Sequence, residues 1–153
     1  MPSRGLLKKS PKNADELAAM KGQLANSWLL LPPSGAFFRE LSAALEAEGG
    51  FGFVGGGTGD LPLTGGNPAS SMDKLPTVPF VRVRGDHLKK LRNLVDEGKE
   101  VEVEFDIRNH FKKGPIPLYN VIADIPGTEH PDEFVVVGGH IDSWDGATGT
   151  TDN

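Results

Sequence analysis

One stretch near the end of the chain decides how its C-terminal part is interpreted, and it reads Phe134-Val135-Val136-Val137-Gly138-Gly139-His140-Ile141-Asp142-Ser143-Trp144-Asp145. Its first four residues form an apolar run that ends at two glycines, which is typical of a buried β-strand. His140 and Asp142 follow where this strand gives way to a loop, and α/β folds place their chemistry at such strand ends. If the extended conformation continues to Asp142, the two side chains point to the same side of the backbone.

The residue types in this stretch suit a metal site. A carboxylate two residues from an imidazole can support that imidazole as a ligand. Asp152 follows on a Gly/Thr-rich segment that can fold back over the same place. Neutral imidazole and carboxylate are ligands of zinc, and one carboxylate can bridge two ions. The pattern therefore indicates a metal site, although a lone histidine at a strand end is more often a polar surface residue.

A family resemblance becomes specific when two further motifs are added, Tyr119-Asn120-Val121-Ile122-Ala123-Asp124-Ile125-Pro126-Gly127 and Thr151-Asp152-Asn153. Together with residues 138–145 they closely resemble the di-zinc aminopeptidase and glutamate carboxypeptidase family. The resemblance implies that His140 ligates one zinc ion and that Asp152 bridges two zinc ions. It also implies that Asp142 supports the site without ligating zinc itself. It also implies metal-assisted hydrolysis of peptide bonds, which is the activity of an exopeptidase.

The same resemblance implies that the site is incomplete in this sequence. The family also needs a general-base Glu, a further acidic ligand and a second ligand His, all beyond the bridging Asp, and this sequence ends at Asn153. We therefore expect a fragment that is inactive by itself and binds zinc weakly or not at all. The alternative is a stand-alone protease-associated module that binds peptides or proteins through the Gly/Pro-rich loop of residues 55–74.

The resemblance also suggests how the domains are organised. Residues preceding the peptidase motifs look like a protease-associated domain, and the best match is at residues 75–83. We expect an extended lead-in over residues 1–12, a protease-associated-like domain over 13–111, a linker over 112–117, and the start of a zinc-peptidase domain over 118–153. The expected fold class is α/β (α+β): a small mixed sheet with about three helices, followed by a hairpin of strands 118–125 and 134–137.

Hydrophobic spacing predicts the elements of the first domain. Helices capped by Asn13, Ser34 and Asp86 are expected to end near Gly22, Gly49 and Gly98. Strands are expected at residues 28–31, 51–54, 78–83 and 100–107, and the first two should form a right-handed parallel unit with the helix between them. The last strand alternates apolar and acidic residues, so its acidic row should face solvent.

Composition excludes several other classes of function. The formal net charge is −5 and the basic clusters are short, so nucleic acid is not an expected partner. No apolar run approaches the roughly 20 residues of a membrane helix, and the first residues lack the apolar core of a signal peptide. With no cysteine, disulfides and thiolate zinc sites are excluded.

Two expectations concern location and partners. The resemblance implies a parent protein that is secreted or periplasmic and that acts on peptides. Strands 118–125 and 134–137 should lack the helices that would cover them. Uncovered apolar strands invite pairing with another chain, so we expect self-association through these two segments.

Overall fold

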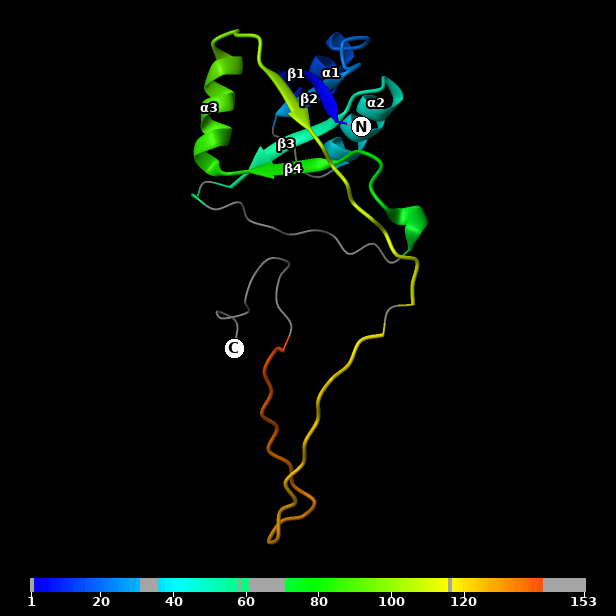
Figure 1. The fold of residues 1–153 in the computed structure, drawn as a ribbon, viewed down its shortest axis with the longest axis vertical. Helices are drawn as coiled ribbons and strands as arrows, with labels where there is room; N and C mark the ends of the chain where they lie inside the picture. The colour runs from blue at the N-terminus through cyan, green and yellow to red at the C-terminus, as the bar shows by residue number, and fades with distance from the viewer. Residues whose placement is uncertain (1, 31–35, 58, 61–70, 116, 142–153) are drawn as a thin grey trace. The chain divides into compact units, whose positions relative to one another are not determined.

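The protein is described by a computed structural model covering residues 2–30, 36–57, 59–60, 71–115 and 117–141, drawn in Figure 1. The chain divides into two units, residues 1–109 and 110–153. Each unit is considered by itself below. The assignment of the first unit to a protease-associated domain stays a prediction.

The first unit is built on a five-stranded mixed sheet with the strand order β4-β3-β2-β1-β5. The strands are β1 (Ser3–Lys9), β2 (Ser27–Leu30), β3 (Gly52–Gly56), β4 (Phe80–Val83) and β5 (Glu102–Phe105). Strands β1 to β4 run parallel to one another, whereas β5 runs antiparallel to β1. The helices are α1 (Ala14–Ala19), α2 (Ala36–Ala47) and α3 (Gly85–Asp96), with a short 3-10 turn at Met72–Lys74. This arrangement confirms the predicted α/β class, with a small mixed sheet and three helices.

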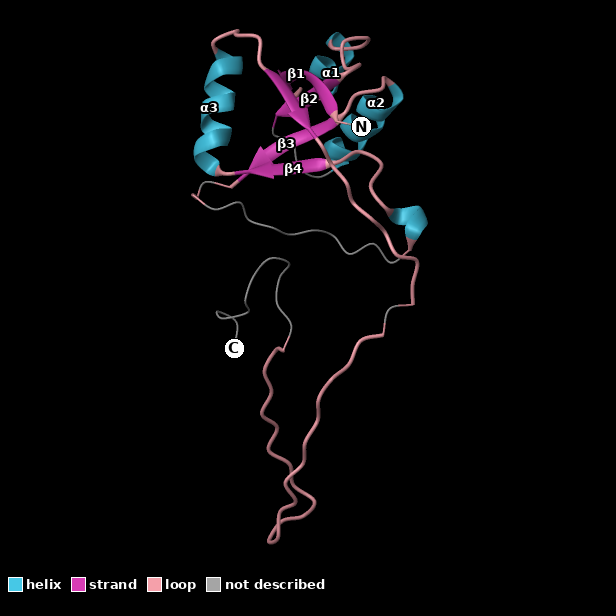
Figure 2. Ribbon diagram, in the orientation of Figure 1, coloured by secondary structure: helices cyan, strands magenta, loops and turns pink. Residues whose placement is uncertain are grey.

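Helices cover both faces of the sheet, as Figure 2 shows, with α3 on one side and α2 on the other. Because side chains alternate along a strand, neighbouring residues of β2 enter different cores. Trp28 and Leu30 join the core beneath α3, and Leu29 joins the core beneath α2. All four residues of β2 are buried, which explains the apolar run from Trp28 to Leu30.

Local sequence signals account for the helix ends. Asn13 accepts a hydrogen bond from the backbone amide of Glu16 at 2.9 Å and thereby caps α1, as predicted. Gly98 ends α3 in the left-handed region at φ 74, and the next amide, that of Lys99, donates to the Leu94 carbonyl at 3.0 Å. This is the bond pattern of a glycine-terminated helix.

The predicted cap of α3 is wrong. The N-cap residue is Arg84, whose side chain makes no capping hydrogen bond, and Asp86 lies inside the first turn. Ser34, the predicted cap of α2, lies outside the described residues. Helix α2 itself begins at Ala36 and runs to Ala47, close to the predicted range.

The lead-in expected over residues 1–12 is extended, and most of it belongs to the sheet. Residues 3–9 form β1, which lies inside the sheet between β2 and β5. Gly5 and Leu7 are buried while Arg4 and Leu6 on the opposite face are exposed. The two lysines that end the strand give it the composition of a polar terminus, but pairing on both edges places it inside the sheet, next to the edge strand β5.

The glycine-rich run that starts at Gly55 begins inside β3 instead of in a loop. Gly55 and Gly56 pair with Arg82 and Val83 of β4. A Cβ atom on Gly55 would lie 2.6 Å from the Phe80 ring, so a larger residue would displace that ring. Residues 58 and 61–70 of the predicted binding loop lie outside the described residues.

In the second unit the predicted hairpin strands are not formed. Neither 118–125 nor 134–137 is assigned as a strand. The chain runs out along the yellow segment, turns where the Glu133 amide donates to the His130 carbonyl at 3.1 Å, and returns along the orange segment (Figure 1). Strands need a partner for their backbone groups, and neither of these segments pairs with any described residue.

Candidate functional site

His140, the first predicted zinc ligand, lies in the second unit on an exposed segment. It follows a run of glycines, and the residue after it, Ile141, is 78% exposed. The predicted partners of His140, Asp142 and Asp152, lie outside the described residues, as do Trp144 and Asp145. Within the described part of the chain, no group of three or more His, Asp or Glu side chains could hold a metal ion.

The residues predicted for the site fit zinc by their chemistry. An imidazole and a bridging carboxylate are ordinary zinc ligands, and about three protein ligands are usual at a catalytic ion. Of these residues the structure describes His140, whose exposed segment is not a strand. The assignment of His140, Asp142 and Asp152 therefore stays a prediction.

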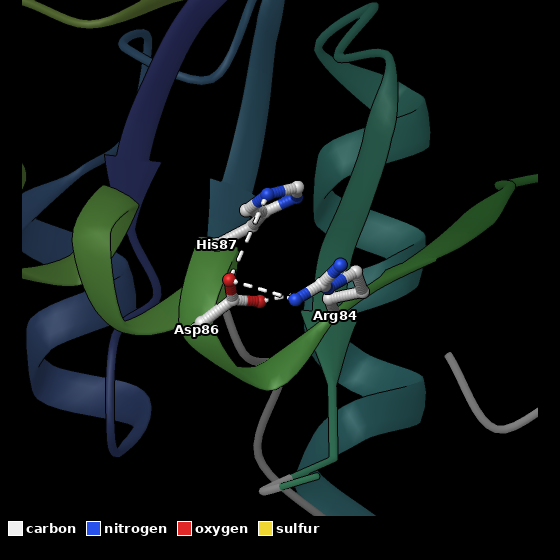
Figure 3. A network of polar contacts seen from close by, with 3 residues as sticks. All are labelled: Arg84, Asp86 and His87. Atoms are coloured by element: carbon white, nitrogen blue, oxygen red, sulfur yellow. Dashed lines mark hydrogen bonds and ion pairs between the residues drawn. The ribbon is translucent and has the colours of Figure 1, made fainter. Parts of the chain in front are cut away.

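A polar network marks the start of α3 in the first unit (Figure 3). The Arg84 guanidinium donates to both carboxylate oxygens of Asp86, at 3.0 and 3.1 Å, and His87 Nε2 lies 3.9 Å from the same carboxylate. Burial alone would raise the pKa of Asp86, but these hydrogen bonds and charges hold that pKa below its usual value. The His87 side chain is 63% exposed, which confirms its interpretation as a surface residue.

The acidic row of β5 faces outward, as its alternation predicts. Glu102 and Glu104 are exposed, while Val103 and Phe105 between them are partly buried against the core beneath α3. Glu102 forms an ion pair with Arg4 of the neighbouring strand at 2.6 Å. This pair lowers the pKa of Glu102 through the Arg4 hydrogen bond. Such a pair at a solvated sheet face contributes little to stability.

A carboxylate that the sequence did not single out holds two elements together. Glu48, just after α2, accepts hydrogen bonds from the backbone amides of Gly22 and Leu24, both at 3.0 Å. These amides belong to the loop that leads from α1 into β2. The bonds from Gly22 and Leu24 lower the pKa of Glu48 from its usual 4.5. No local pattern indicates this contact, because it spans 26 and 24 residues of sequence.

Replacing Glu48 with glutamine is expected to lower the free energy of unfolding at neutral pH. It should also make that free energy less dependent on pH in the acidic range. A folded-state pKa below the unfolded value contributes stability that is present above the unfolded pKa and is lost as pH falls through the folded pKa. The glutamine side chain has one acceptor oxygen and no charge. The measurement is the urea midpoint of wild type and Glu48→Gln at neutral pH and below pH 4.

The matched control is Glu40→Gln, which changes an exposed carboxylate of α2, the helix that precedes Glu48. We expect the two glutamine variants to differ at neutral pH and to converge with wild type in acid. Equal urea midpoints for Glu48→Gln and Glu40→Gln at neutral pH would contradict the role of Glu48.

Comparison with known families gives an independent assignment of the C-terminal part. Residues 120–153 match the family described as Peptidase family M28. This segment resembles peptidase family M28. The match includes His140, Asp142 and Asp152, and it confirms the family resemblance inferred from the motifs. Among the described residues no helix is long and apolar enough to cross a membrane.

Several curated proteins that match part of this chain share the name Carboxypeptidase Q. The protein from Xenopus laevis is 27% identical over 81 residues, which cover 52% of this chain and 17% of that protein. The protein from Rattus norvegicus is 27% identical over 86 residues, covering 53% and 17%, and the human protein is 26% identical over 82 residues, covering 53% and 17%. This chain thus spans about one sixth of the length of these relatives. No solved structure matches it.

Proposed function

We propose that this chain contributes part of the active site of a co-catalytic zinc exopeptidase. The observation that carries the proposal is the match of residues 120–153 to peptidase family M28, which spans every residue that the motif analysis assigned to metal. The relatives named Carboxypeptidase Q support an exopeptidase. Preference for the amino or the carboxyl end of the peptide is not part of the proposal.

The roles proposed for the residues are those that the family resemblance implies, and the side-chain chemistry of each residue suits its role. His140 would donate a ring nitrogen to one zinc ion, Asp152 would hold both ions through its two oxygens, and Asp142 would orient the His140 ring. When bound, the ions lower the pKa of a water molecule and polarise the scissile carbonyl. The remaining ligands and the general base would come from residues that this sequence does not contain, and the parent protein would be secreted or periplasmic.

Zinc binding by the chain is expected to be weak and to depend on His140 and Asp152. One imidazole and one shared carboxylate fall short of the usual three or more ligands, so the ion should exchange readily. Titration with zinc, followed by calorimetry, should show affinity reduced several-fold by His140→Ala or Asp152→Asn. The matched control is His87→Ala, because His87 is an exposed histidine of the first unit.

Affinities that are equal in wild type, His140→Ala and Asp152→Asn would refute the assigned ligands. Activity is tested in parallel with aminoacyl chromogenic substrates and added zinc, and no turnover is expected from the chain alone. Turnover that disappears with a chelator and in Asp152→Asn would show that the missing ligands come from elsewhere, such as a second copy. The incomplete-site interpretation would then be wrong.

The alternative, a module that binds peptides through residues 55–74, gains no support from the described part of that loop. Gly55 and Gly56 are occupied in pairing with β4. We therefore retain the exopeptidase proposal.

A further inference from the structure

The second unit exposes an unusual amount of apolar surface. Ten large apolar side chains between residues 118 and 141 are 78–98% exposed. Five of them lie within residues 118–125, namely Leu118, Tyr119, Val121, Ile122 and Ile125. Burial of these side chains against another chain is therefore favourable.

The segment 118–125 also has unpaired backbone groups. Residues 118–125 make no backbone hydrogen bond to any described residue. The segment contains Val121, Ile122 and Ile125, which are β-branched and favour strands. A second chain added alongside would satisfy these groups, as happens at open sheet edges.

The charges around the segment favour one orientation of the second chain. Lys112 and Lys113 precede it, while Glu129, Asp132 and Glu133 lie at the turn that follows it. Two copies paired antiparallel bring the lysines of each copy toward the acidic turn of the other. A parallel arrangement would place lysines beside lysines and acids beside acids, and like charges directly opposite are unfavourable.

We propose that two copies of this chain pair as antiparallel strands through residues 118–125, about a two-fold axis. The register that places Leu118 of one copy opposite Ile125 of the other also places Val121 opposite Ile122. Every large aliphatic side chain of the segment then meets another across the pair. Such an isologous contact closes on itself, so it predicts a dimer in place of an open polymer.

The first test uses cysteine pairs, which are unambiguous because the protein has no cysteine of its own. Opposite residues of an antiparallel pair lie about 4.5–5.5 Å apart, within reach of a disulfide. A mixture of Leu118→Cys and Ile125→Cys chains should form a cross-linked dimer on oxidation. Leu118→Cys alone should not, since its two cysteines would lie about 24 Å apart.

The second test exchanges charges. The double variant Lys112→Glu/Lys113→Glu should dimerise at least about tenfold more weakly than wild type, because it places acidic residues opposite the acidic turn of the other copy. The double variant Glu129→Lys/Glu133→Lys should weaken dimerisation similarly, because it places lysines opposite lysines. An equimolar mixture of the two should recover the dimer, since it restores both opposite-charge contacts. Lys89→Glu/Lys90→Glu changes the net charge equally on exposed residues of α3 and should leave dimerisation unchanged. Sedimentation equilibrium gives the dissociation constants.

Three results would overturn the proposal. A chain that stays monomeric at every accessible concentration would show that these segments are covered within one copy. Cross-linking of Leu118→Cys alone would show a parallel register. Equal weakening by the α3 variant and the Lys112/Lys113 variant would show that only net charge matters.

Discussion

Replacement of Trp28 by alanine is expected to lower the free energy of unfolding of the first unit by about 3–5 kcal/mol. Trp28 is fully buried in β2. Its ring packs edge to face against Phe105 of β5, with 4.7 Å between the ring centroids, and its centroid lies 6.1 Å from that of Phe51. Trp28 therefore connects β2 with β5 within the core. Its indole Nε1 also donates to the Ser3 carbonyl at 3.2 Å. Truncation leaves a cavity beneath α3 and removes that hydrogen bond.

The measurement is urea unfolding followed by far-ultraviolet circular dichroism, which does not depend on tryptophan fluorescence. Trp28→Phe is the matched control, because it keeps an aromatic ring and loses the bond to Ser3. We expect the phenylalanine variant to lose less stability than the alanine variant. A loss below about 1 kcal/mol for Trp28→Ala, the size of an ordinary surface change, would mean that Trp28 does not anchor this core.

Two neighbouring leucines of β1 test which face of this strand is buried. Leu7→Ala is expected to cost about 2–5 kcal/mol, because Leu7 is 4% exposed and belongs to the core beneath α3. Leu6→Ala should cost less than about 1 kcal/mol, because Leu6 is 38% exposed. The two variants remove the same atoms from adjacent positions, so the difference reports burial alone.

Both leucine variants are measured by the same urea unfolding experiment. If residues 3–9 were a frayed terminus, neither substitution would change the unfolding midpoint. Equal and small effects would therefore show that residues 3–9 are not part of the sheet. Equal and large effects would show that the face of the strand is assigned incorrectly.

Much of the first unit follows from local pattern. The apolar face of α3 and the alternation of β5 are visible in the sequence because each element repeats its contacts at its own period. The parallel pairing of β2 and β3 across α2 also matches expectation, since a strand, helix and strand in succession have few alternative arrangements. Gly49 and Gly98 end their helices at positive φ, a conformation that glycine adopts without steric cost.

The contacts that sequence reasoning missed are distant in the chain. Glu48 reaches Gly22 and Leu24, and Arg4 reaches Glu102. The pairing of β1 with β5 joins the two ends of the first unit. A local pattern cannot report which of several extended segments become neighbours.

For the predicted metal site, the motif around His140 was sufficient to indicate the family, which the match of residues 120–153 confirms. The spacing of an imidazole and carboxylates carries that information because ligand chemistry depends on residue type. The predicted strand before His140 is not formed, since a strand is defined by its partner. Phe134 and its neighbours have the composition of a strand but no described residue to pair with.

The sequence by itself determined the residue types at the predicted zinc site and the inward face of most helices and strands of the first unit, because periodicity and side-chain chemistry are local properties. Only the tertiary structure decided that residues 3–9 are an internal strand and that Gly55 and Gly56 belong to a sheet. Backbone pairing satisfies hydrogen bonds with distant partners, and the identity of those partners depends on the whole fold.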